Sequence, residues 1–336
     1  FPSVRECNAA LAAFGDDGEL LRALRLFVKM RKAASLAAHA SSPETAGGRA
    51  SSGPGGPGGG VGLVLFHPPA PTLVTYSTLM SRAVSTGKPR VALRLWNLMK
   101  SQKEFFANED HGGGGNASER RAVGLPIVPD VKAANILMNT YAKLADPGSA
   151  RDLLSQMQNP KGGPDVLPVR PNIVTWNTFV DACHRAGDLA TGMDALEDMK
   201  AAGVRPDART YTSLISTVAR RRTRRAGARD PDAAFALFEE MTRDRNVRPN
   251  GMTYCALIDV CGRCGRSDLA LKGLRMMLRQ KAREGGNRPL ENEVGAWTAA
   301  IDACGKAGRI DTAAQLFRTM QRFGVKPNAV TCGCLT

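Results

Sequence analysis

The stretch NIVTWNTFVDACHRAGD, residues 172–188, returns in altered form as EVGAWTAAIDACGKAGR, residues 293–309. The two stretches agree at a tryptophan, at an Asp-Ala-Cys triplet and at an Ala-Gly pair, all at the same spacing. Agreement of this kind indicates an internal repeat, which has to be identified before any other feature of the fold. The agreeing pairs are Trp176/Trp297, Asp181/Asp302, Ala182/Ala303, Cys183/Cys304, Ala186/Ala307 and Gly187/Gly308.

The repeat is 35 residues long where it is uninterrupted. A repeat that starts at Ile173 has Gly187 at its fifteenth place and Met199 at its twenty-seventh, and it ends at Asp207. The same frame fits other parts of the chain, and in six of the seven repeats a methionine occupies the twenty-seventh place without any gap. We therefore predict a repeat array over residues 4–328 and a truncated eighth repeat over residues 329–336. The predicted repeats start at residues 4, 73, 131, 173, 208, 251 and 294.

Each repeat is predicted to fold as two helices joined by a turn. In the first half of the clearest repeat, apolar residues follow the i, i+3, i+4, i+7 spacing of one helical face, at Trp176, Phe179, Val180 and Cys183. Gly187 ends this helix, because glycine adopts the left-handed conformation of a helix terminus at low cost. One hairpin cannot bury its apolar face alone, so successive hairpins must stack. The sequence thus predicts an all-α solenoid of about seven helix-turn-helix repeats plus a truncated eighth.

Two long insertions interrupt the array between one hairpin and the next, at residues 33–60 and 107–124. Both are rich in Gly, Ser, Ala and Pro, and they carry too little apolar surface to offset the entropy of ordering. We expect both insertions to be disordered loops. The HGGGG run at 111–115 is interpreted as part of such a loop, because no Lys-Ser or Lys-Thr pair follows it as in a phosphate-binding loop.

The amino-acid pattern of the repeats closely resembles that of the pentatricopeptide repeat family. The first helices carry VTYSTLM at 74–80, VTWNTFV at 174–180 and RTYTSLI at 209–215. The W-x-x-L-G-x-x-Y pattern of tetratricopeptide repeats, which have a similar period, is absent. The resemblance covers residues 4–328 apart from the insertions and implies a right-handed α-solenoid. The repeat ends that share it are VPD (128–130), VRPN (169–172), VRPD (204–207), VRPN (247–250) and VKPN (325–328).

This resemblance implies an organellar RNA-binding protein in which each repeat reads one nucleotide of a single strand. The fifth and last residues of a repeat would contact the base, and the second residue would wedge against it. The residues are compatible with this role, since Val174, Asn177 and Asp181 cluster on the helical face away from the apolar one. Stacked repeats would line one surface with short donor and acceptor groups suited to a base edge.

Carried over repeat by repeat, the family's code assigns bases to five repeats. Asn177 with Asp207 resembles a uracil reader. Two further repeats, with Asn8 and Thr72 and with Cys255 and Glu293, depart from the pattern and receive no base. Read with the N-terminal side as 5′, starting at the repeat of Ser77, the expected RNA is roughly G, pyrimidine, U, A, any base, A. The other assigned pairs are Ser77 with Asp130 for guanine, Asn135 with Asn172 for a pyrimidine, and Thr212 with Asn250 and Thr298 with Asn328 for adenine.

The second place of the repeat is irregular. Val74 and Val174 fit the wedging role that the resemblance implies. Lys132 and Arg209 do not fit it, and we expect them to hold phosphate instead. Gly295 offers neither an apolar nor a charged side chain.

The charge balance suits a polyanionic partner. Lys and Arg exceed Asp and Glu by 46 − 31 = 15, and the sequence pI is about 9.8. The run RRRTRR at 220–225 is open to two interpretations, a phosphate contact or a solvated loop. Single-stranded RNA is the predicted partner, with further RNA-processing proteins beside it and no small-molecule substrate. Two alternatives remain open: a scaffold for protein partners on the same surface, and the RNA-guiding part of an RNA-processing enzyme whose catalytic domain lies outside this chain.

Cysteine usage follows the repeat frame and does not favour a metal site. Cys183, Cys261 and Cys304 share the eleventh place, on the apolar face, where a free cysteine behaves as a small hydrophobe. Cys261 and Cys264 have the spacing of a zinc knuckle, but no convincing further ligands accompany them. The sequence therefore predicts no bound metal and no cofactor.

No set of residues suggests catalysis, so we expect the chain not to be an enzyme. Asp181, Asp259 and Asp302 share the ninth place and are interpreted as hydrogen-bonding groups on the helix surface. The longest apolar run, VGLVLF at 61–66, is much shorter than the roughly 20 residues of a membrane span. The chain begins with Phe1 and is expected to be an excerpt of a longer protein. A mitochondrial or plastid location follows from the resemblance alone.

Overall fold

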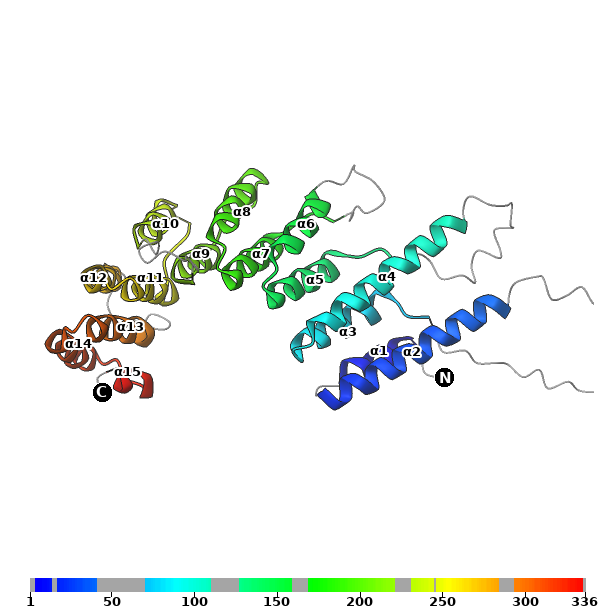
Figure 1. Cartoon of the computed structure of the whole chain (residues 1–336), viewed down its shortest axis with the longest axis horizontal. Coiled ribbons are helices and arrows are strands. Elements are labelled where there is room, and N and C mark those ends of the chain that lie inside the picture. Colours follow the sequence, from blue (N-terminus) through cyan, green and yellow to red (C-terminus); the bar gives the residue numbers. More distant parts are fainter. Residues whose placement is uncertain are drawn as a thin grey trace, which may run out of the picture. The chain divides into compact units, whose positions relative to one another are not determined.

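The computed structural model describes residues 4–13, 17–40, 70–109, 127–158, 169–220, 231–244, 246–283 and 293–334. Within these ranges the only regular secondary structure is helical, and the helices follow one another in pairs joined by short turns (Figure 1). The predicted all-α class of stacked helix-turn-helix repeats is confirmed. The helices are α1 (Val4–Ala13), α2 (Asp17–Ala40), α3 (Leu73–Ser85), α4 (Pro89–Glu109), α5 (Val131–Leu144), α6 (Pro147–Gln158), α7 (Ile173–Ala186), α8 (Leu189–Ala201), α9 (Ala208–Arg220), α10 (Pro231–Arg243), α11 (Gly251–Arg263), α12 (Ser267–Arg283), α13 (Glu293–Lys306), α14 (Ile310–Arg322) and α15 (Ala329–Gly333).

The chain divides into two compact parts. The N-terminal part comprises residues 1–140 and 167–169, and the C-terminal part comprises residues 141–166 and 170–336. Helices α1 to α4 belong to the first part, helices α6 to α15 belong to the second, and α5 crosses the division along the chain. Within the N-terminal part, α3 packs against α1, α2 and α4.

The C-terminal part has two layers of helices. The first helices of its repeats, α7, α9, α11 and α13, lie side by side in sequence order (Figure 1). Each of the second helices α8, α10 and α12 packs against the first helix before it and the first helix after it. The first helices therefore form a continuous inner layer, and any row of side chains along them is held in register by this packing.

The core lies between these layers and repeats with the sequence. Trp176, Phe179, Val180 and Cys183, the predicted apolar face of α7, are fully buried. The methionine at the twenty-seventh place, and its equivalent in the repeat with the insertion, is buried as well. These methionines are Met30, Met99, Met157, Met199, Met241, Met277 and Met320.

In five hairpins whose turns the structure describes, the turn contains one residue in the left-handed conformation. Gly187 ends α7 at φ +73°, and its N–H donates to the carbonyls of Cys183 and His184. The repeat that starts at residue 131 has no glycine there, and Ala145 adopts φ +53° in its place. A side chain at positive φ is strained. The turn is therefore maintained in this repeat at the expense of local strain.

Two helices run further than the sequence analysis expects. Helix α2 continues to Ala40 and α4 continues to Glu109, so residues 33–40 and 107–109 are helical rather than part of the insertions. The stretch RKAASLAAHA, at the end of α2, is rich in alanine and other strong helix formers, which accounts for the extension. The remaining residues of both insertions, 41–60 and 110–124, lie outside the described residues, as do residues 221–225 of the basic run. Among the described helices, none combines the length and the apolarity that a membrane span requires.

Candidate nucleic-acid interface

In five repeats the last residue caps the first helix of the next one. The side-chain oxygen of this cap residue accepts a hydrogen bond from the backbone N–H three residues further on, in the geometry of a helix N-cap. Sequence analysis predicted these residues as base contacts and did not foresee the capping role. The cap distances are 2.8 Å for Asp130, 3.0 Å for Asn172, 2.9 Å for Asp207, 3.0 Å for Asn250 and 2.8 Å for Asn328.

The structure brings Asn177 and Asp207 together, as the uracil assignment requires. Asn177 Nδ2 donates to Asp207 Oδ2 at 3.1 Å. The other end of the amide, Oδ1, accepts from the hydroxyl of Thr210 at 2.6 Å. Asn177 is only 8% exposed, so these two partners hold the amide with little competition from water. The amide of Asn177 is thus held at both ends.

Thr212 and Thr298, the two threonines predicted to read adenine, are each linked to their cap residue by the hydroxyl of a second threonine. Thr212 Oγ1 lies 2.9 Å from Thr253 Oγ1, and Thr253 Oγ1 lies 3.1 Å from Asn250 Oδ1. The last complete repeat has the same arrangement, with 2.7 Å between the hydroxyls of Thr298 and Thr331. Thr331 is 2.8 Å from the Oδ1 of its cap residue, Asn328. Each predicted pair therefore belongs to one hydrogen-bonded group.

Asn8 makes the same kind of contact, although no base was assigned to its repeat from the sequence. The hydroxyl of Thr75 donates to Asn8 Oδ1 at 2.6 Å, and Thr72 Oγ1 lies 3.3 Å from Thr75 Oγ1. Packing of α1 against α3 brings these residues together across the long insertion. The sequence signal that could have identified Asn8 is Thr75, at the third place of the next repeat. Asn177 is likewise followed by a threonine at that place, Thr210.

The other two predicted pairs are less complete. Ser77 donates to the carbonyl of Val74 at 3.1 Å, while Asp130 caps α5. Asn135 belongs to the N-terminal part of the chain and Asn172 to the C-terminal part. These four residues keep the positions in their helices that the repeat frame assigns, and their roles stay predictions.

The second place of the repeat is exposed wherever a side chain occupies it. Val174 is 54% exposed on α7, and Val74 is similarly exposed on α3. Lys132 and Arg209 are exposed as well, in keeping with a phosphate contact. Sequence analysis missed two members of this row, Met252 at 48% and Val330 at 65% exposed, which are large apolar side chains facing solvent. Exposed apolar groups at this spacing are available to pack against bases.

The repeat that starts at Gly251 lacks a reading group. Its last residue, Glu293, is 4% exposed, and both carboxylate oxygens accept from Lys281 Nζ at 2.8 Å. Its fifth residue is Cys255, and a Cβ at Gly295 would lie 3.2 Å from the Cys255 sulfur. The buried ion pair and the close approach of α13 leave no room for the arrangement seen at Asn177.

Other residues singled out in the sequence have structural roles. Asp181 accepts from Arg185 at 2.8 Å and Asp259 from Arg263 at 2.8 Å, each one helical turn away. Asp302 makes the same contact with Lys306. This confirms their interpretation as surface hydrogen-bonding groups, and such exposed pairs add little stability.

The three cysteines at the eleventh place, Cys183, Cys261 and Cys304, are fully buried, which confirms their interpretation as core residues. Burial raises the pKa of the Cys183 thiol and of the Cys261 thiol to about 12. Both therefore stay protonated at neutral pH, whereas metal binding and nucleophilic attack need the thiolate. In the described part of the chain, no three His, Cys, Asp or Glu residues are grouped as a metal ion would require.

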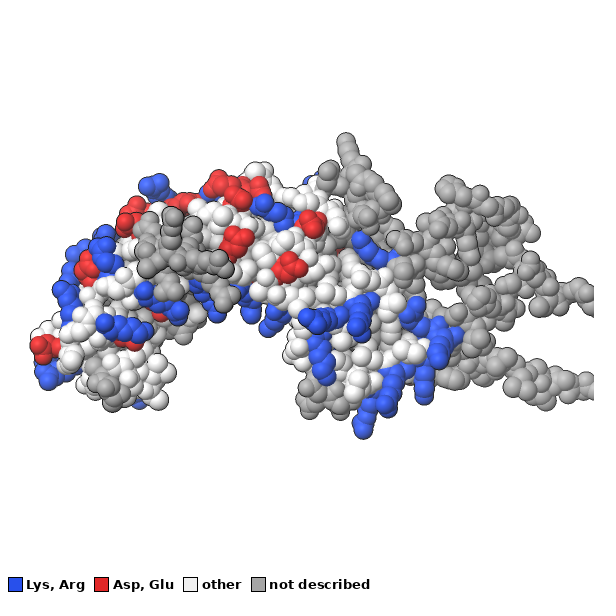
Figure 2. Space-filling view, in the orientation of Figure 1, with Lys and Arg blue, Asp and Glu red and all other residues white. Residues whose placement is uncertain are grey.

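Charge is distributed unevenly over the surface. In Figure 2 the visible face of the N-terminal part carries Lys and Arg with little acidic neighbour, whereas acidic side chains gather near α8 and α10 in the C-terminal part. Four of the cations, at i, i+3, i+7 and i+10 along α2, are exposed. These cations are Arg22, Arg25, Lys29 and Lys32. Such a surface attracts polyanions over a distance set by the salt concentration.

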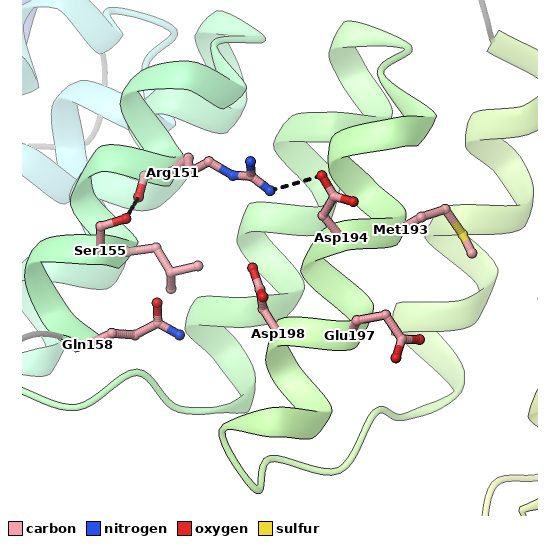
Figure 3. Close-up of a pocket in the computed structure, with 8 residues that line it drawn as sticks. Arg151, Ser155, Gln158, Met193, Asp194, Glu197 and Asp198 are labelled. Carbon is pink, nitrogen blue, oxygen red and sulfur yellow. Dashed lines mark hydrogen bonds and ion pairs between the residues drawn. The ribbon is translucent and has the colours of Figure 1, made fainter.

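A groove of about 570 Å³ runs between the second helices α6 and α8 (Figure 3). Leu154 and Met193 contribute apolar lining, while Asp194, Glu197 and Asp198 line it with carboxylates. An ion pair of 3.3 Å between Arg151 and Asp194 spans it. The groove lies on the second helices, whereas the reading and cap residues lie on or beside the first helices. Its acidic lining does not suit a phosphate backbone.

Comparisons with known proteins agree on one family. Models of the pentatricopeptide repeat match residues 7–33, 74–103 and 252–281 (PPR repeat), 171–220 and 292–335 (PPR repeat family) and 223–266 (pentatricopeptide repeat domain). Among similar proteins is a chloroplastic pentatricopeptide repeat-containing protein of Arabidopsis thaliana, 25% identical over 224 residues, which are 65% of this chain and 22% of that protein. A mitochondrial one from the same plant is 26% identical over 211 residues, or 62% of this chain and 39% of that protein.

Solved structures of the same family are also similar to the chain. The crystal structure of the pentatricopeptide repeat protein PPR10 from maize has a TM-score of 0.42 at 19% identity, covering 79% of this chain and 36% of that one. PPR10 in complex with an 18-nt psaJ RNA element has a TM-score of 0.39 at 18% identity, covering 100% and 47%. The matched part of the chain spans between 17% and 39% of the length of the first four curated relatives.

Proposed function

The chain belongs to the pentatricopeptide repeat family, and from that premise we propose that it binds single-stranded RNA sequence-selectively, one base to a repeat. The observation that carries the proposal is the group formed by Asn177, Asp207 and Thr210. Its amide is held at both ends, which leaves one N–H and one oxygen lone pair for a base. Selectivity by pre-positioned donors and acceptors is how helical repeats read single-stranded RNA.

Affinity in this proposal comes mainly from phosphate contacts. The net charge of +15, the exposed Lys132 and Arg209 at the second place and the cations of α2 all favour a polyanion. Counterion release then makes binding weaken as the salt concentration rises. Val74, Val174, Met252 and Val330 are exposed at the spacing of the repeats and would pack against bases.

We further propose that the chain acts on organellar transcripts, in processing, stabilisation, splicing or translation. Curated relatives are named as chloroplastic or mitochondrial proteins, which supports a mitochondrial or plastid location. The matched part of the chain spans less than two fifths of the length of the first four of these relatives, so the activity of the whole protein is part of this proposal. Further RNA-processing proteins would then be partners of the full-length molecule.

The test is binding to short RNAs at near-physiological salt. We expect an RNA containing GCUAAA or GUUAAA to bind more tightly than a shuffled RNA or the corresponding DNA. Asn177→Thr should move the preference at the third base from U toward G, while the exposed Asn97→Thr on α4 should change nothing. Equal, salt-sensitive binding to all strands would reduce the surface to a general polyanion site. No binding to any strand would favour a scaffold for protein partners.

A further inference from the structure

Four fifth-place residues share one contact: the side chain meets the hydroxyl of a threonine at the third place of the following repeat. The threonines, Thr75, Thr210, Thr253 and Thr331, are fully buried. The same hydroxyls take part in the N-cap of their own helix, so each lies between a cap residue and a reading residue. The distances are 2.6 Å for Asn8 to Thr75, 2.6 Å for Asn177 to Thr210, 2.9 Å for Thr212 to Thr253 and 2.7 Å for Thr298 to Thr331.

We propose that this third-place threonine is a positioning residue, which fixes the hydrogen-bond polarity of the reading side chain in the preceding repeat. The proposal rests on the proposed function and adds to it a third residue for each base. The threonine touches no RNA in this scheme. It acts by deciding which atoms of its neighbour remain as donors and which as acceptors.

Hydrogen positions follow from the chemistry of the groups at Thr210. Its oxygen accepts the backbone N–H of Asp207 at 3.2 Å, so its single hydrogen is available for donation. That hydrogen goes to Asn177 Oδ1 at 2.6 Å rather than to the Asp207 carboxylate at 3.0 Å. A hydroxyl has one hydrogen, and the shorter contact takes it.

The amide of Asn177 is oriented by two partners of opposite character. The Asp207 carboxylate can only accept, so it faces Nδ2, while the donated hydrogen of Thr210 faces Oδ1. An asparagine amide whose ends are interchangeable could not distinguish uracil from cytosine, because those bases exchange donor and acceptor along their Watson–Crick edge. With the ends fixed, the remaining N–H and lone pair match the carbonyl and N3–H of uracil.

The threonine readers show the same logic. Thr212 donates its hydrogen to the carbonyl of Ala208 at 2.6 Å, so Thr253 must supply the hydrogen in the contact between the two hydroxyls. One lone pair of Thr212 then remains, and this makes it an acceptor only. An acceptor can take a hydrogen bond from the exocyclic amino group of adenine, the base that the family resemblance assigns to this repeat. Thr298 donates to Val294 in the same way and meets Thr331.

Two repeats supply natural exceptions. Ala133 stands at the third place after the repeat of Ser77, and Ala296 after the repeat of Cys255. Neither alanine has a hydroxyl to donate. We expect weaker discrimination at the first and fifth bases of the RNA for this reason.

The experiment compares Thr210→Val and Thr253→Val, which remove a hydroxyl and keep the shape of the side chain. Thr210→Val should lower the preference for U over C at the third base by roughly three- to tenfold, the size of one lost hydrogen bond, and leave the fourth base unchanged. Thr253→Val should weaken the preference for A at the fourth base and leave the third unchanged. Thr210→Ser, which keeps the hydroxyl, should restore the U preference.

Thr217→Val is the matched control for lost stability. Thr217 is a buried threonine on the same helix, and its hydroxyl bonds to the carbonyl of Ser213 at 2.7 Å and to His184 Nδ1 at 3.2 Å, far from any reading residue in the hydrogen-bond network. This variant should lower the melting temperature and leave both base preferences intact. The proposal is overturned if Thr217→Val relaxes the preferences as much as Thr210→Val does, or if neither valine variant at places 210 and 253 changes them.

A second readout separates this proposal from the proposed function. The side-chain amide signal of Asn177 in an NMR spectrum of the free protein is identified by its loss in Asn177→Thr. In Thr210→Val it should move toward the shifts of exposed asparagines, and in Thr210→Ser it should stay in place. If the wild-type chain shows no base preference, the proposed function fails while this signal still reports on positioning. An unchanged signal in Thr210→Val would refute the positioning role.

Discussion

At the scale of single residues, the side chains of this surface have two tasks. Asp207 holds Asn177 through one carboxylate oxygen and caps α9 through the other. Loss of an N-cap costs about 1 kcal/mol on its own. A variant at a cap residue therefore changes folding and binding together, and its effect on RNA affinity has to be corrected for stability. Variants at the fifth place avoid this difficulty, since Asn177 is not a cap.

Ala145 offers a direct test of the left-handed turn residue. Ala145→Gly should raise the free energy of unfolding by about 0.5–1 kcal/mol, because glycine relieves the strain of φ +53° and loses part of that gain to its greater entropy when unfolded. Gly187→Ala, in the equivalent turn at φ +73°, should lower it by a similar amount. Urea denaturation followed by circular dichroism measures both. Equal stability of all three proteins would show that neither turn is strained.

At the scale of helices, stacking depends on how closely neighbours approach. A Cβ built at Gly262, on α11, would lie 3.0 Å from the Cβ and 3.4 Å from the Cα of Ala303 on α13. These are closer than ordinary van der Waals contacts, and one of the atoms belongs to the backbone. The two first helices therefore pack with small residues at their closest point, and a larger side chain there has to separate them.

Gly262→Leu should accordingly destabilise the chain by about 1–3 kcal/mol, as overpacking of a well-packed contact does. Gly148→Leu is the control, because a Cβ at Gly148 meets only the Asp146 carboxylate at an ordinary 3.5 Å. It should leave stability unchanged or raise it slightly through helix propensity. Thermal unfolding by calorimetry distinguishes the two. A melting temperature lowered equally by both leucines would contradict the argument from α11 and α13.

The helices and the core were predictable from sequence because each depends on local spacing. The apolar period placed Trp176 and Cys183 in the core, and glycine marked the turn at Gly187. The contact between Asn177 and Thr210 was not predictable in the same way, since it joins residues 33 positions apart and depends on how far one helix is displaced along its neighbour. Asn8 was missed because a long insertion separates it from Thr75. The ion pair of Lys281 with the buried Glu293 was not predictable either, because it joins α12 to α13 and depends on how these helices pack.

At the scale of the whole molecule, the main contacts between the described helices join helices of the same or adjoining repeats. In the described part of the C-terminal array, α9 packs against helices of its own and the adjoining repeats, and so do α11 and α13. The stability of such a chain is close to a sum over repeats and their interfaces. Removal of some repeats should therefore leave the others folded, unlike truncation of a globular domain.

A chain that ends at residue 250, without α11 to α15, tests this expectation. We expect it to lose helical signal in proportion to the helices removed and to melt at a lower temperature, because α9 loses its packing against α11. It should still prefer U at the third base, since Asn177, Asp207 and Thr210 remain. Circular dichroism and RNA binding measure these properties. Collapse of the entire helical signal would show that the array folds as one indivisible unit.

The buried pair of Lys281 and Glu293 has a consequence for how many transcripts the molecule could recognise. A repeat that reads a base without ambiguity excludes three of every four competing sites, and a repeat that reads nothing excludes none. The repeat of Cys255 would keep its neighbours at the correct spacing while accepting any letter. This repeat would therefore span one nucleotide of the RNA without selecting its base. A target can then mutate at that letter without escaping recognition, so comparison of target sites should find the fifth letter free to vary between letters that are held constant.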